Sequence, residues 1–135
     1  MAHVHGKNTV IKVGASDISQ YVNTSELTEA ADTHDVTTYG NDAHRYDGGL
    51  LDNKFTMAGV YDSTASTGPR AVLKPLRGQK GAIVRQPEGT GSGLPQDSFS
   101  AVLNSYVETS PTADMVAWST EWTIDGEVDD TPQAV

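Results

Sequence analysis

Apolar and polar residues alternate along much of the chain, and this alternation predicts β-strands. It is clearest at residues 54–61, where Phe55 and Met57 share one face. Two longer alternating segments, residues 98–109 and 115–124, are joined by a short turn, which predicts an antiparallel pair. Shorter strands are predicted at residues 9–13, 24–31 and 81–85.

Two short segments have helical spacing instead. Ile18, Tyr21 and Val22 follow an i, i+3, i+4 pattern that suits one helical turn. Pro69 is suited to the first turn of a helix, and the apolar residues after it have the spacing of one buried helical face until Gly78 ends the pattern. We therefore expect one short helix that packs across a mainly β domain.

Residues 32–49 form a long polar stretch. Gly, Asn and Asp residues interrupt every regular apolar period there, which predicts a loop. Residues 36–39 within it have high β propensity, and we expect a strand there that forms only against a neighbouring subunit. A loop of this length is uncommon in so small a domain unless it has a function.

The length of 135 residues predicts one domain with one hydrophobic core. We expect a flexible N-terminal arm at residues 1–8, a β-rich domain at residues 9–128 and a flexible acidic C-terminal tail at residues 129–135. The two tryptophans fall on one face of their strand, which favours core packing over a ligand platform. The predicted core residues are Phe55, Met57, Leu73, Phe99, Leu103, Trp118 and Trp122.

Charge and composition narrow the possible functions. Eighteen Asp and Glu against nine Lys and Arg give a formal net charge of -9, which argues against a surface that grips nucleic acid. Basic residues concentrate in the middle of the chain, so complementary patches could pair neighbouring subunits. The chain has no cysteine for a disulfide or a zinc site. No apolar run is long enough to span a bilayer, and we expect the product to be cytoplasmic when made.

Candidate catalytic and metal chemistry is weak. The His3-x-His5 pair lies near the chain terminus, where rigid coordination is not expected. The triple glycine at residues 89–93 lacks the Lys-Ser or Lys-Thr pair of a phosphate loop, and the chain has no Gly-x-Ser-x-Gly elbow. Acidic and histidine side chains of the polar loop match no metal or acid–base template. We therefore predict no catalytic residue, no cofactor, no metal and no enzyme activity.

One ordered series of segments consists of residues 17–22, 29–41 and 49–62, which read DISQYV, EAADTHDVTTYGN and GLLDNKFTMAGVYD. This series resembles the tail tube (major tail) proteins of long-tailed bacteriophages. Residues 17–22 (DISQYV) followed by residues 29–41 (EAADTHDVTTYGN) are similar to the family's acidic, Ile or Leu, Ser, x, Tyr segment and its acidic stretch ending in Thr-Thr-aromatic-Gly. Residues 49–62 (GLLDNKFTMAGVYD) resemble its Gly-Leu, acidic, strand, Gly, aromatic, Asp pattern. With the late strand at residues 118–126, the resemblance covers residues 10–128.

The resemblance implies a β-sandwich or barrel-like fold with one short flanking helix and a long inter-subunit loop. It implies self-assembly into stacked hexameric rings that form the tail tube of a virion, the conduit for genome delivery, with assembly in the host cytoplasm. Partners would be the chain itself, tail-tip, tape-measure and terminator proteins, and DNA only in transit through the acidic lumen. The expected inter-subunit residues are Asp35, Val36, Thr37, Thr38, Tyr39, Gly40, Asn41, Arg45 and Tyr46.

Other functions remain open from the sequence. A head-tail connector or a capsid decoration protein would share the β-rich composition and self-association, and only the series of segments disfavours them. A small-ligand-binding β-barrel would need a persistent internal pocket and would form no polymer.

Overall fold

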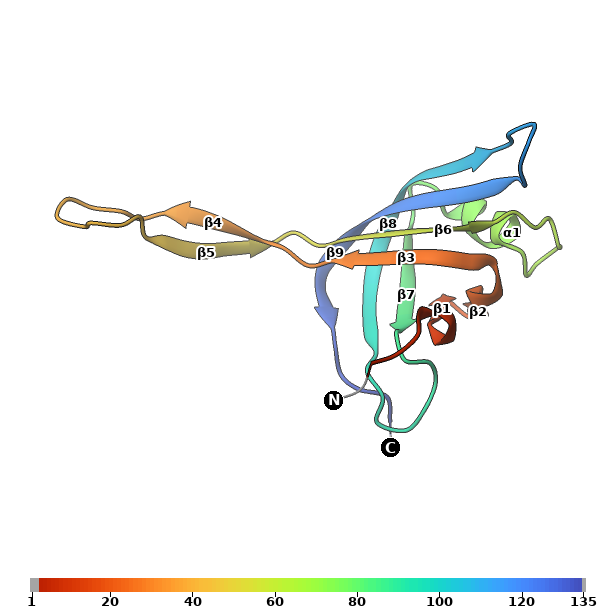
Figure 1. Ribbon diagram of the computed structural model, residues 1–135, viewed down its shortest axis with the longest axis horizontal. Coiled ribbons are helices and arrows are strands. Elements are labelled where there is room, and N and C mark those ends of the chain that lie inside the picture. Colours follow the sequence, from red (N-terminus) through yellow and green to blue (C-terminus); the bar gives the residue numbers. More distant parts are fainter. Residues whose placement is uncertain (1–2, 135) are drawn as a thin grey trace.

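The computed structural model describes residues 3–134, which form a curled antiparallel β-sheet with a long projecting hairpin (Figure 1). The seven-stranded sheet has the order β2-β1-β7-β8-β9-β6-β3, and β4 pairs with β5 separately. The strands are β1 (Val10–Val13), β2 (Ser16–Asp17), β3 (Val22–Thr28), β4 (Ala31–Asp35), β5 (Tyr46–Leu51), β6 (Lys54–Val60), β7 (Lys80–Gln86), β8 (Asp97–Thr109) and β9 (Ala117–Asp129). Helical pieces are η1 (Gly6–Asn8), η2 (Ser19–Tyr21), α1 (Pro69–Leu73) and η3 (Lys74–Leu76).

The sheet curls until its two ends approach each other, which gives the body its barrel-like form. Turn η2 links β1 to β3 at this point: the N–H of Ile11 donates to Ser19 Oγ at 2.9 Å, and Ser19 Oγ donates to the carbonyl of Ile11 at 3.3 Å. A cleft of about 420 Å³ remains beside this link, lined by residues that include Thr9, Ile11 and Val22. The predicted barrel-like β fold is therefore confirmed, as a single curled sheet that is open between β1 and β3.

The core fills the inside of the curl. Trp122 and Trp118 are buried on the same face of β9, and the Trp118 indole N–H donates to the carbonyl of Val60 at 3.0 Å. The Trp122 indole N–H donates to Thr120 Oγ1 at 3.0 Å, so both buried rings have satisfied polar atoms. Phe55 packs edge-on against Phe99 with ring centroids 5.3 Å apart. The structure also buries the other residues expected in the core, which are Met57, Leu73 and Leu103.

Helix α1 and turn η3 cover one end of the sheet. Leu73 is fully buried, and Leu76 approaches Gly81 beside the ring of Trp122. Arg70 Nη1 donates to both carboxylate oxygens of Glu108 at 2.7 Å, which ties the helix to β8 and raises the pKa of Arg70. Within residues 3–134, no helix has the length and apolar character needed to cross a membrane.

The predicted loop at residues 32–49 is instead a β-hairpin, residues 31–51, called the hairpin below. Strands β4 and β5 pair in register His34↔Asp47 and Asp35↔Tyr46. The expectation that residues 36–39 form a strand against a neighbouring subunit stays a prediction. On the single chain, residues 36–45 form the tip, and strands flank them instead. The cause is that cross-strand hydrogen bonding overrides the low β propensity of Gly48 and Gly49.

Two further boundaries differ from the predictions. The strand expected at residues 24–31 begins earlier, at Val22, and ends at Thr28, with a break before β4. Strand β9 extends to Asp129, beyond the predicted end at residue 124, because it keeps pairing with β8 as far as Ser98↔Asp129.

The chain ends were expected to be flexible at residues 1–8 and 129–135, of which residues 1, 2 and 135 lie outside the described residues. Residues 6–8 form turn η1. At the other end, Gln133 contacts the loop at residues 89–95: its N–H donates to the carbonyl of Leu94 at 3.0 Å, and its Nε2 donates to that of Gly89 at 2.8 Å.

Gly59 on β6 lies close to the backbone of Tyr21 at the η2–β3 corner, and a substitution tests this close approach. Gly59→Ala is expected to lower the free energy of unfolding by about 3 kcal/mol, because the added Cβ would overlap the carbonyl oxygen of Tyr21, which is backbone and cannot rotate away. Gly48→Ala is the matched control, since nothing lies within 4 Å of a Cβ there. Urea unfolding followed by tryptophan fluorescence measures both variants, and equally small losses would contradict the close approach.

Candidate interaction surface

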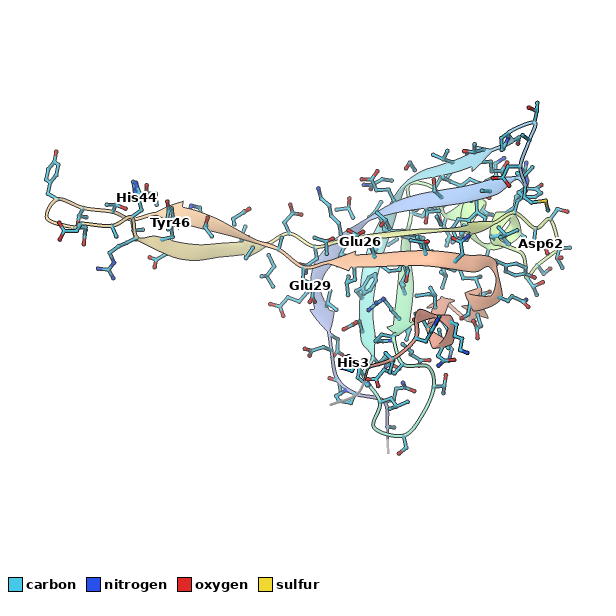
Figure 2. The ribbon with its side chains drawn as sticks, viewed as in Figure 1. His3, Glu26, Glu29, His44, Tyr46 and Asp62 are labelled. Atoms are coloured by element: carbon cyan, nitrogen blue, oxygen red, sulfur yellow. The ribbon has the colours of Figure 1, made fainter. Side chains whose placement is uncertain are left out.

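The hairpin projects far from the body, and every residue of β4 and β5 is exposed (Figures 1 and 2). A two-stranded hairpin is marginally stable alone, because it has no third strand or helix to bury an apolar face against. It contributes no residue to the hydrophobic core. The hairpin projects, is exposed and lies outside the core of the body. These three features are typical of a surface that contacts another molecule.

The root of the hairpin is hydrogen-bonded to the body through Asn53. This side chain is 2% exposed, and its Oδ1 accepts a hydrogen bond from the N–H of Ala30 at 3.2 Å. The carbonyl of Asn53 accepts from the N–H of Ile124 on β9 at 3.1 Å, and the N–H of Asp52 donates to the carbonyl of Ala30 at 2.8 Å. Both hairpin strands are therefore fastened to each other and to the sheet at one point.

The tip is ordered by its own hydrogen bonds. The Asp35 carboxylate accepts the N–H of Thr37 at 2.9 Å, and hydrogen bonds from the Thr37 hydroxyl and N–H lower the pKa of Asp35. Thr37 Oγ1 accepts the N–H of Arg45 at 2.8 Å, and the N–H of Val36 donates to the carbonyl of Arg45 at 2.9 Å. Asn41 Nδ2 donates to the carbonyl of Thr38 at 2.9 Å. The tip thus has a defined shape without a partner.

All residues expected to contact another subunit lie on the hairpin. Asp35 and Tyr46 close its paired strands, and the other expected residues occupy the tip. Tyr39 is fully exposed, and Tyr46 is 60% exposed beside the ring of His44, at a centroid distance of 6.2 Å (Figure 2). Exposed aromatic rings bury large areas when a partner covers them.

Three residues of the hairpin and its root were not predicted from the sequence. Leu50 is 81% exposed and Leu51 is 53% exposed near the root of the hairpin, and Asn53 fixes the root. Two leucines that follow two glycines in a polar stretch could have indicated an exposed apolar patch. For Asn53 there was no such signal, because an Asn before a strand is also typical of a turn.

The body adds a second surface suited to association. Strand β3 is at one edge of the seven-stranded sheet and pairs only with β6, so its outer side has free backbone donors and acceptors. Its seven residues are exposed or half-buried.

Within residues 3–134, no three His, Asp or Glu side chains come together in a group that could hold a metal ion. On the hairpin, His44 Nδ1 lies 3.7 Å from Asp35 Oδ2, and both side chains are exposed.

Comparison with known proteins identifies the fold. The sequence matches no protein-family model and no curated protein. The SPP1 tail tube matches with a TM-score of 0.79 at 7% identity, over 98% of this chain and 81% of that chain. A chain of the native gene transfer agent virion matches with a TM-score of 0.76 at 16% identity, over 96% of this chain and 99% of that chain. A chain of the PVC sheath–tube complex, from an extracellular contractile injection system, matches with a TM-score of 0.65 at 17% identity, over 98% of this chain and 93% of that chain.

These matches span almost the whole chain, at 96–98% of its length. The chain therefore has the tail tube fold, as the resemblance of its sequence segments implied.

Asn53→Ala tests the root of the hairpin. We expect the free energy of unfolding to fall by about 1–2 kcal/mol, because the Ala30 N–H loses its buried acceptor. Hydrogen exchange of the Ala30 amide should become faster, while the amides of β8 should remain the more strongly protected against exchange. Asn23→Ala on β3 is the control, since Asn23 is exposed. If the two variants have the same stability and the same exchange at Ala30, Asn53 does not fix the root.

Proposed function

We propose that this chain is a structural tail tube protein of a phage or phage-like particle, and that it assembles into stacked hexameric rings that form the conduit for genome delivery. The observation that carries this proposal is the exposed hairpin, which is hydrogen-bonded at its root to a body of tail tube fold and contributes no residue to the core of that body. The hairpin would then form contacts between neighbouring copies of the chain.

The structural neighbours support this assembly. The tail of the gene transfer agent particle has C6 symmetry, and its chain matches with a TM-score of 0.73 at 16% identity. By analogy with that tail, six copies would form each ring, and the open edge of β3 would meet a sheet edge of the adjacent copy through main-chain hydrogen bonds. Tail-tip, tape-measure and terminator proteins belong to the same proposal as further partners, with assembly in the host cytoplasm and a final place in the virion tail.

The charge of the chain suits a conduit for DNA. A net charge of -9 repels phosphate groups, so a tube with acidic side chains on its inner wall would let DNA slide without adhering.

Two alternatives are less well supported. A ligand-binding barrel needs an internal pocket, but Trp118, Trp122 and Phe55 fill the inside of this sheet. A connector or decoration protein would share the self-association, and the tail tube fold of the neighbours is the observation that favours the tube.

The direct test is assembly of the unaltered protein. Size-exclusion chromatography of a dilute sample should give a monomer, and negative-stain electron microscopy after concentration should give hollow tubes or rings of uniform diameter. A protein that stays monomeric in all conditions would exclude the tube function.

A shortened hairpin tests the role of the tip. Replacing residues 36–45 by Asn-Gly joins Asp35 and Tyr46, which pair directly, through a two-residue turn. The variant should keep the urea midpoint of the body, because the tip contacts no core residue, and should fail to form tubes at concentrations where the unaltered chain does. Normal tubes from a folded variant would show that the tip is dispensable.

A further inference from the structure

Two segments that lie towards opposite ends of the molecule differ in their own charge, and they are called the acidic pole and the basic pole below. Residues 29–52, which include the hairpin, contain six acidic residues and one arginine. Residues 61–80, which include α1 and η3, contain four basic residues and one acidic residue. Figure 2 shows Tyr46 on the hairpin and Asp62 beside α1 at opposite ends of the long axis. One copy therefore cannot bring these two regions together, but two copies can.

The basic pole has a depression next to helix α1. It has a volume of about 390 Å³ and is lined by Ser63, Arg70, Ala71, Lys74, Pro75 and Arg77. Its walls combine apolar surface from alanine and proline with three cations. An aromatic ring suits such a lining, because its faces attract cations and its area covers the apolar floor.

Two of these cations are free to pair with another molecule. Arg70 is held by Glu108 at 2.7 Å, and Lys80 nearby is held by Asp125 at 2.8 Å. Lys74 and Arg77 form no ion pair within residues 3–134. Their charge is therefore uncompensated by any side chain of the described part of the molecule.

The acidic pole presents a matching element. Tyr39 is fully exposed at the tip, and Asp42 lies three residues beyond it. Asp47 is exposed on β5, behind the tip. The hydrogen bonds within the tip fix its shape before any contact, which reduces the entropy lost on docking.

We propose that the hairpin tip of one copy docks in this depression on a second copy, with the Tyr39 ring between Lys74, Arg77 and Pro75 and the hairpin carboxylates paired with the two free cations. This inference rests on the proposed tube function and adds the receiving surface to it. Because the two surfaces differ and lie at opposite poles, the contact is head-to-tail and continues from copy to copy in a ring or a stack.

Charge reversal with rescue tests the pairing. Lys74→Glu/Arg77→Glu and Asp42→Lys/Asp47→Lys should each raise the concentration needed for tubes by about tenfold or more, since like charges then face each other. The chain carrying all four substitutions restores opposite charges and should recover most of the loss. Lys7→Glu/Lys12→Glu is the control for net charge, because both residues lie outside the depression. Normal assembly of both double variants, or no recovery in the fourfold variant, would overturn the docking.

Disulfide trapping tests the contact itself and does not depend on tube formation. The chain has no cysteine, so Tyr39→Cys/Ala71→Cys introduces the only two thiols. Mild oxidation of the concentrated protein should give a ladder of covalent multimers on non-reducing gels, whereas Tyr39→Cys/Ser92→Cys, with its second thiol on the 89–95 loop, should give far less.

The two proposals fail in different ways. Tubes of the unaltered protein without the ladder would overturn the docking and leave the tube function in place. A ladder from a protein that forms no tubes would support the docking and exclude the tube function.

Discussion

The packing of strand β9 inside the curled sheet is the interaction on which the rest of the structure depends. It pairs with β8 on one side and β6 on the other, and it supplies both buried tryptophans. Their indole N–H groups are satisfied by Val60 and Thr120 within the same body. Because no hairpin residue belongs to this core, the hairpin is available for association. The outer side of β3 is available too, although Val22 and Leu27 of that strand pack against the core.

A body with its own core, together with an exposed hairpin and a free strand edge, would allow one chain to be soluble as a monomer and still polymerise. The outer side of β3 and the exposed Leu50 and Leu51 are hydrated on the single copy, and a partner would remove this surface from water. The hairpin is already folded and fixed at Asn53, so docking would order few additional residues. Association would then depend on surface complementarity more than on coupled folding.

Alternation of apolar residues was enough to predict β6, β8 and β9, since each buries one face against the core. Pro69 and Gly78 similarly bounded the short helical region. The hairpin could not be predicted this way, because both faces of β4 and β5 meet solvent and no apolar period exists to read. The depression at Lys74 and Arg77 could not be predicted from the sequence either, since only the fold brings Ser63 beside the helix.

Placement of opposite charges at opposite poles has a consequence for the form of the assembly. Two copies joined through one such contact still expose one free hairpin and one free depression, so the dimer has the same capacity to grow as the monomer. A contact between identical surfaces would instead stop at two copies. Salt screens the attraction beyond about 8 Å at physiological ionic strength, so charge would guide the approach only at short range and set its direction. The aromatic ring at the tip and the strand edges would then supply the short-range contacts that hold the copies in register.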